Sequence, residues 1–104
     1  MQYVLVEWEH DLDDEPYMIY SELDESRREV RRVEFYRNGI CFSYGGERGN
    51  EGALNPDPFP EDLRELNRED EDGVCRAQSI PPGLFYEIWN QAQERPDGFM
   101  GMFF

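Results

Sequence analysis

The one histidine of the chain, His10, lies among carboxylates in residues 10–15 (HDLDDE). These residue types could supply a general base held by a carboxylate, or a divalent-cation site. The spacing does not match an EF-hand loop, because no glycine is present for its sharp turn. A second histidine or a suitably placed cysteine for zinc is also missing. We therefore favour a solvated acidic turn, and keep a small metal-dependent enzyme using His10 with Asp11, Asp13 or Asp14 as an alternative.

The other reactive residue types lack the context that catalysis requires. The glycine-rich segment 45–52 carries two glutamates and no lysine, so we expect no phosphate cradle there. Cys41 lies inside a predicted strand with no group to lower its pKa. Cys41 and Cys75 are the two cysteines of the chain, and two are too few for a disulfide scaffold. We expect both to be buried thiols, with a disulfide or redox pair as the alternative. We predict no cofactor, no metal site and no enzymatic activity.

Net charge restricts the partners more than any motif does. The chain has 24 Asp and Glu against 10 basic residues, all of them arginine, and a formal net charge of -14. Such a surface repels phosphate backbones and anionic lipids, and attracts basic proteins. No apolar run approaches the roughly 18 residues of a membrane span, and the first residues do not resemble a secretory signal. We expect a cytoplasmic protein with a basic protein partner, no direct nucleic-acid contact and no membrane contact.

The charges are distributed unevenly along the chain. Acids dominate residues 7–15 and 57–72, whereas residues 27–37 are rich in arginine. In one interpretation these arginines pair with acids of neighbouring strands. In the other, the two acidic segments form one negative surface that binds a basic partner. The residues expected on that surface are Glu9, Asp11, Asp13, Asp14, Glu15, Glu69, Asp70, Glu71 and Asp72.

Alternation of apolar and polar residues predicts an antiparallel sheet. Asn38-Gly39 is a strong hairpin signal between the third and fourth strands. Val30 falls out of phase with its strand, which predicts a bulge near Arg31 and Arg32. The expected strands cover residues 3–8, 17–23, 29–36, 40–44 and 74–80.

The remaining segments are a loop, two helices and a tail. Residues 45–60 are rich in Gly, Asn and Pro and predict a long surface loop, followed by a short helix over 60–67. Residues 69–73 form an acidic turn. Residues 84–93 predict a helix that packs on the sheet through the apolar stripe Leu84, Phe85, Ile88, Trp89 and Ala92. The apolar tail 96–104 is expected to dock on its own chain, which favours a monomer over a homodimer.

Several short motifs carry a resemblance to a known group of domains. They are Val6-x-Trp8-x-His10-Asp11, Asp14-Glu15-Pro16, residues 20–24 (YSELD), Arg28-x-Val30-Arg31-x-Val33-Glu34 and Asn38-Gly39. On these the chain resembles a family of small bacterial, actinobacterial-type domains of unknown function. The resemblance covers about the first 44 residues and then the apolar stripe from Phe85 to Trp89. It implies no catalytic residue. In type, although not in motif, the chain is also similar to small acidic immunity proteins that neutralise toxins.

The sequence therefore predicts one α+β domain over residues 1–104. Its expected fold is a four- to five-stranded antiparallel sheet with a C-terminal helix packed on one face and a short helix in the connection. The function that we expect is non-enzymatic binding, most simply that of an immunity or inhibitor protein that blocks a basic site on a toxin or another protein. A nucleic-acid mimic that inhibits a DNA- or RNA-binding protein is the alternative from a second class.

Overall fold

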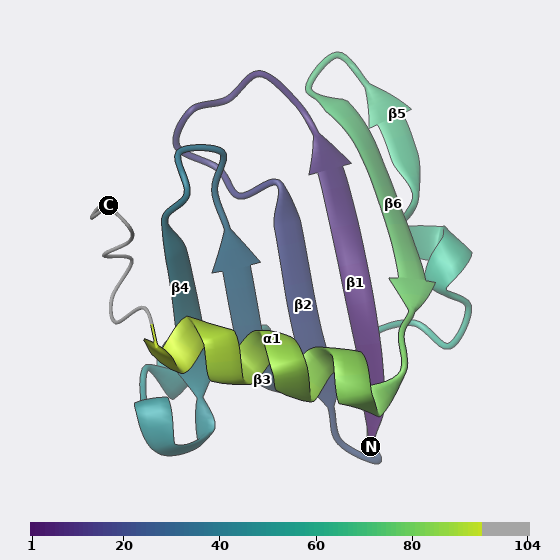
Figure 1. Ribbon diagram of the computed structural model, residues 1–104. Helices are drawn as coiled ribbons and strands as arrows, with labels where there is room; N and C mark the ends of the chain where they lie inside the picture. Colours follow the sequence, from purple (N-terminus) through teal and green to yellow (C-terminus); the bar gives the residue numbers. More distant parts are fainter. Residues whose placement is uncertain (95–104) are drawn as a thin grey trace.

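The computed structural model describes residues 1–94, which form an antiparallel sheet crossed by an α-helix (Figure 1). The sheet order is β4-β3-β2-β1-β6-β5. The first four strands form the expected meander, and β6 pairs with the other side of β1. The elements are β1 (Gln2–Glu9), β2 (Met18–Leu23), β3 (Glu29–Phe35), β4 (Cys41–Gly45), β5 (Arg68–Asp70), β6 (Gly73–Ser79) and α1 (Pro82–Glu94).

The sheet has six strands within residues 1–94, whereas the sequence predicted four to five. The additional strand is β5, which forms a hairpin with β6 and includes residues 69 and 70 of the turn expected over 69–73, so that the turn itself is shorter than expected. The short helix predicted over residues 60–67 is also wrong. The structure has only a 3-10 turn there, at Leu63–Leu66. The Asp62 carboxylate caps this turn by accepting a hydrogen bond from the Arg64 N–H at 3.0 Å.

A bulge in β3 determines which side chains share a face. Glu22 lies opposite Arg31, but the next residue of β2, Leu23, lies opposite Glu29. Val30 is therefore the extra residue, one position before the predicted site. As a result Glu29 lies on the same face as Arg32, and the two side chains form an ion pair at 2.7 Å.

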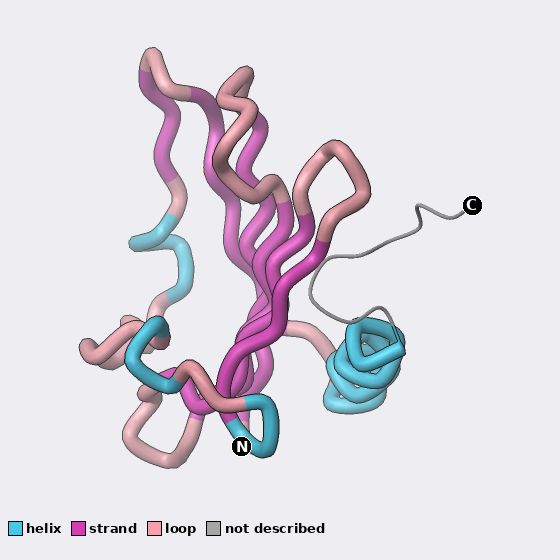
Figure 2. The backbone as a smooth tube through the Cα atoms, turned by 90° about the vertical axis from the view of Figure 1, so that its left-hand side faces the viewer, coloured by secondary structure: helices cyan, strands magenta, loops and turns pink. Residues whose placement is uncertain are grey.

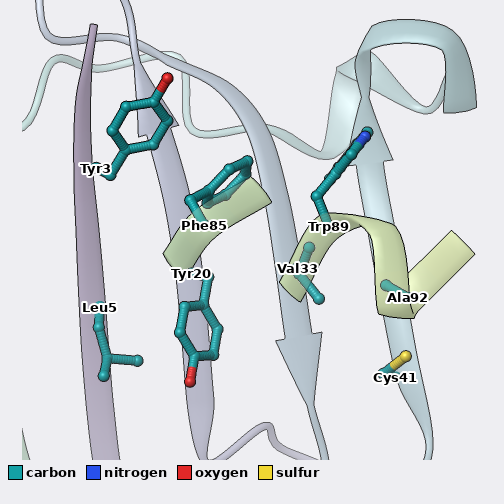
Figure 3. Packing of buried hydrophobic residues seen from close by; sticks show 8 residues of the cluster. All are labelled: Tyr3, Leu5, Tyr20, Val33, Cys41, Phe85, Trp89 and Ala92. Carbon is teal, nitrogen blue, oxygen red and sulfur yellow. The ribbon is translucent and has the colours of Figure 1, made fainter. Parts of the chain in front are cut away.

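Helix α1 packs across one end of the sheet and covers the main core (Figures 1 and 3). Pro82 begins the helix, where a missing N–H has no cost. Phe85, Trp89 and Ala92 face the sheet at a spacing of four and then three residues, and all three are buried. Leu84 is 37% exposed, so its predicted place in the apolar stripe is wrong. One residue is about 100° of helix rotation, which turns Leu84 away from the line that contains Phe85.

The sheet contributes the rest of this core and also buries side chains on its other face. Under α1 the buried cluster includes Tyr3, Leu5, Tyr20, Val33 and Cys41. On the opposite face Val4, Ser21 and Leu23 are almost fully buried. Residues 51–66 lie largely on that side, away from α1 (Figure 2). Within residues 1–94 no helix has the length and apolarity needed to cross a membrane.

Both cysteines are free thiols, and the three strands β3, β2 and β1 separate their strands. Cys41 is buried, as expected, whereas Cys75 is only half-buried. Burial raises the pKa of the Cys75 thiol, with a smaller opposing effect from Arg68. The apolar tail predicted over residues 96–104, together with its expected docking, lies outside the described residues.

Candidate protein-binding surface

Residues 9–15 and 69–72, which are parts of the acidic segments 7–15 and 57–72, lie at the same end of the sheet. The remainder of the second segment does not, since the carbonyl oxygens of Phe59 and Pro60 accept hydrogen bonds from Arg27 near the β2–β3 turn at the opposite end. Residues 9–15 begin at the last position of β1 and continue into the turn after it, and residues 69–72 form the end of the β5–β6 hairpin. Strands β1 and β6 are antiparallel neighbours, and Glu9 lies opposite Val74. The turn after β1 is therefore beside the turn before β6, at the end away from α1 (Figure 1). We call these nine exposed carboxylates the acidic end: Glu9, Asp11, Asp13, Asp14, Glu15, Glu69, Asp70, Glu71 and Asp72.

A hollow of about 470 Å³ lies between the two acidic segments. Four members of the acidic end line it, namely Glu9, Asp11, Glu71 and Asp72, and Arg37 of the β3–β4 turn also lines it. The other five members do not line this hollow. The sequence analysis had therefore selected these four carboxylates. It did not predict the hollow between them or the place of Arg37 in its lining.

Gly73 allows the two segments to approach each other closely. Its φ is +131°, a conformation that L side chains rarely adopt, and a Cβ there would lie 2.0 Å from the Glu9 carbonyl oxygen. Only glycine leaves room for the β5–β6 turn against the end of β1. The sequence does carry a signal for this turn, because Asp72-Gly73 is a dipeptide typical of hairpins.

The acidic end has almost no internal counter-charge. Within residues 1–94, only Asp70 among its nine members forms an ion pair, with Arg68 at 3.5 Å between exposed side chains. Arg37 donates a hydrogen bond to the Leu12 carbonyl oxygen at 3.4 Å. Carboxylates that are exposed and lack partners create a negative potential that attracts cations over about a Debye length.

His10 holds the acidic turn in shape through both of its ring nitrogens. The Leu12 N–H donates to Nδ1 at 2.9 Å, which makes Nδ1 the acceptor, and Nε2 therefore donates to the Pro16 carbonyl oxygen at 2.9 Å. The ring also packs against Trp8, with 4.2 Å between ring centroids. Both ring nitrogens are thus engaged by backbone groups of the turn. Within the described part of the chain, moreover, no three His, Cys, Asp or Glu side chains are grouped so as to hold a metal ion.

The arginines of β3 lie at the other end of the sheet and are used inside the fold. Arg31 pairs with Glu22, directly opposite on β2, at 2.5 Å, and its guanidinium lies 4.7 Å from the Trp89 ring centroid. The Tyr3 hydroxyl donates to the same carboxylate at 2.9 Å. Burial alone would raise the pKa of Glu22, but hydrogen bonds from Arg31 and Tyr3 lower it below its usual value.

Arg32 forms a second internal cluster on the opposite face of the sheet. It pairs with Glu29 and with Glu34, each at 2.7 Å, and donates to the Ala53 carbonyl oxygen at 2.9 Å. Glu34 also accepts from the hydroxyl of Tyr36, and burial together with the Glu34 charge raises the pKa of Tyr36 to about 12. We call Glu22, Arg31, Glu29, Arg32 and Glu34 the paired charges.

The loop expected over residues 45–60 is fastened to these paired charges and to the neighbouring turn. It contains two 3-10 turns, Gly46–Arg48 and Glu51–Ala53. The Asn55 N–H donates to Glu29 at 2.8 Å, and Arg27 donates to the Phe59 and Pro60 carbonyl oxygens at 3.1 and 2.6 Å. Arg27 and Arg32 thus fasten this loop to the rest of the fold, away from the acidic end.

Comparison with known proteins identifies the family. The family model described as "Domain of unknown function (DUF6881)" matches residues 2–94, so the chain belongs to this family. No match was found among curated proteins or among solved structures.

Proposed function

We propose that this member of the DUF6881 family is a small, non-enzymatic binding protein whose acidic end occupies a basic site on a protein partner. One observation carries the proposal: the paired charges are bound to one another inside the fold, while the acidic end is exposed with one weak ion pair within residues 1–94. Fourteen uncompensated negative charges repel one another in a monomer, and a basic partner relieves that repulsion.

The proposed mechanism is steric block assisted by electrostatic steering. The negative potential increases the rate of encounter with a basic surface, and the turns on either side of the 470 Å³ hollow then cover that surface. The partner class that fits best is a toxin with a basic active cleft, which makes the chain a bacterial, cytoplasmic immunity or inhibitor protein. A hollow accepts side chains that protrude from a partner, whereas a nucleic-acid mimic presents its charge on a protruding surface. We therefore propose blocking of a protein site, with mimicry of a phosphate backbone as the alternative.

The experiment is capture from a native lysate by three immobilised proteins. They are the wild type, an acidic-end variant (Asp11→Asn, Asp13→Asn, Asp14→Asn) and a control variant (Glu25→Gln, Glu61→Gln, Glu65→Gln). The control removes the same number of exposed charges away from the acidic end. We expect wild type and control to retain one basic protein at low salt, and the acidic-end variant to lose it. Equal capture by all three proteins would contradict the proposal.

A further inference from the structure

A second, smaller hollow lies next to the acidic one and is built mainly on the sheet. Its volume is about 310 Å³, and it shares Glu9 and Val74 with the larger hollow. The residues that matter for its chemistry are Glu7, Glu9, Tyr17, Met18, Val74 and Arg76. Most of them belong to β1, β2 and β6, and side chains on strands are held more precisely than those on loops.

The strand register places the relevant side chains on one face. Glu7 lies opposite Met18 on β2 and opposite Arg76 on β6, and Glu9 lies opposite Val74. This is the face on which α1 packs, because Glu7 follows the core residues Tyr3 and Leu5 at the two-residue spacing of one strand face. Helix α1 crosses the other end of the sheet and leaves this end of β1, β2 and β6 uncovered (Figure 1). The residues that line the hollow belong mainly to this uncovered end.

Its two carboxylates are free to bind a cation. Within residues 1–94 neither Glu7 nor Glu9 has an ion-pair partner, even though Arg76 faces Glu7 across the strand pair. Met18 and Val74 are half-buried and provide apolar surface beside these carboxylates. The hollow thus combines an apolar wall with a net negative charge.

We infer that this hollow takes the side chain of an arginine of the basic partner, an inference that rests on the proposed function. A volume near 310 Å³ is at the lower limit of ligand pockets and suits one long side chain. The aliphatic part of the partner's arginine side chain would lie on Met18 and Val74, while its guanidinium stays in contact with water. Glu7 and Glu9 are two residues apart on a strand, about 6.6 Å. A guanidinium has donors on several sides and can bind both carboxylates at once. The ammonium of lysine is a single compact charge and would bind one of them at a time.

The test is a titration of the full chain, followed by nuclear magnetic resonance of its backbone amides. The probes are acetyl-Gly-Arg-Gly-amide and its counterparts with lysine and with uncharged citrulline. We expect saturable shifts confined to residues 7–9, 17–18 and 74–76, weaker binding of the lysine peptide and no binding of the citrulline peptide. Glu7→Gln should weaken arginine binding about tenfold, the effect of one charge-assisted hydrogen bond. Glu65→Gln, an exposed acid away from the hollow, should leave it unchanged.

Three results would overturn the inference: shifts spread over the whole acidic surface, equal binding of the lysine peptide, or no change in Glu7→Gln. Its failure is distinguishable from that of the proposed function. If the captured partner binds Glu7→Gln as tightly as wild type but does not bind the acidic-end variant, the proposed function holds and the arginine hollow is wrong. If the acidic-end variant binds the partner as wild type does, the proposed function itself is wrong.

Discussion

At the end of the sheet beneath α1, arginines and glutamates neutralise one another within the fold, whereas at the opposite end the carboxylates of two turns stand in solvent. Arg31 and Arg32 are largely buried, with 18% and 17% of their side chains exposed, and each is held by carboxylates. In the acidic end only Asp70 has an ion-pair partner within residues 1–94. Arginines that are fixed on the sheet cannot move to neutralise distant acids. The arginines of the paired charges therefore leave the negative charge of the acidic end uncompensated.

The largest effect that we expect comes from Trp89, which links α1 to the paired charges. Trp89 is 3% exposed and its ring stacks on Phe85. The guanidinium carbon of Arg48 lies 3.8 Å from the centroid of that ring. Trp89→Ala should lower the free energy of unfolding by about 3–5 kcal/mol, because a large buried aromatic is removed. Chemical denaturation measures this change. Leu84→Ala in the same helix is the control and should cost less than about 1 kcal/mol, since Leu84 is 37% exposed. Equal losses would mean that α1 packs through a different face.

Removing Arg32 tests whether the paired charges stabilise the fold. Arg32→Met leaves Glu29 and Glu34 buried without their shared cation, and should cost about 3 kcal/mol. Arg64 is the matched control, because its pair with Asp62 is exposed, and Arg64→Ala should cost about 1 kcal/mol or less. Thermal and chemical unfolding of both variants decide the question. A loss in Arg32→Met no greater than in the control would show that its network contributes little.

Gly73 lets the β5–β6 turn approach the end of β1 closely. Its replacement should lower the free energy of unfolding by less than the loss of Trp89 or Arg32 does. Gly73→Ala puts a Cβ into the Glu9 carbonyl oxygen and strains the backbone, at a cost of about 2 kcal/mol. It should also move the β5–β6 turn away from β1 and weaken partner binding. Gly52→Ala is the control, because no atom lies within 4 Å of its added Cβ. If Gly73→Ala binds and unfolds like the control, the close approach of the two turns is not required.

A smaller effect is expected in the pH dependence of stability, to which the buried carboxyl group of Glu22 contributes. Its pKa is lower in the folded state than the usual 4.5, so the folded state favours the carboxylate. This contribution to stability is present above about pH 4.5 and is lost as the pH falls through the folded-state pKa. Glu22→Gln should be less stable than wild type at pH 7 and should lose less stability on acidification. An unchanged slope of unfolding free energy in acid would contradict the assignment.

Local patterns in the sequence predicted much of this fold. Alternation identified five strands, Asn38-Gly39 identified a hairpin, and Val30 out of phase identified the bulge within one residue. Strand β5 escaped because it has only three residues, Arg68–Asp70, all exposed, so no apolar side chain marked it. The carboxylates of the acidic end were chosen from composition. That residues 9–15 and 69–72 lie at one end depends on the pairing of β1 with β6, a long-range contact that no local pattern contains.

The most direct test of the account is the association rate of the captured partner, measured over a series of salt concentrations. Wild type and the control variant (Glu25→Gln, Glu61→Gln, Glu65→Gln) should associate fast at low salt and lose about tenfold or more in rate as salt screens the acidic end. The acidic-end variant (Asp11→Asn, Asp13→Asn, Asp14→Asn) should start slower and depend less on salt. An association rate of the wild type that stays constant across the salt series, or an acidic-end variant with the same salt dependence as the control, would contradict the account.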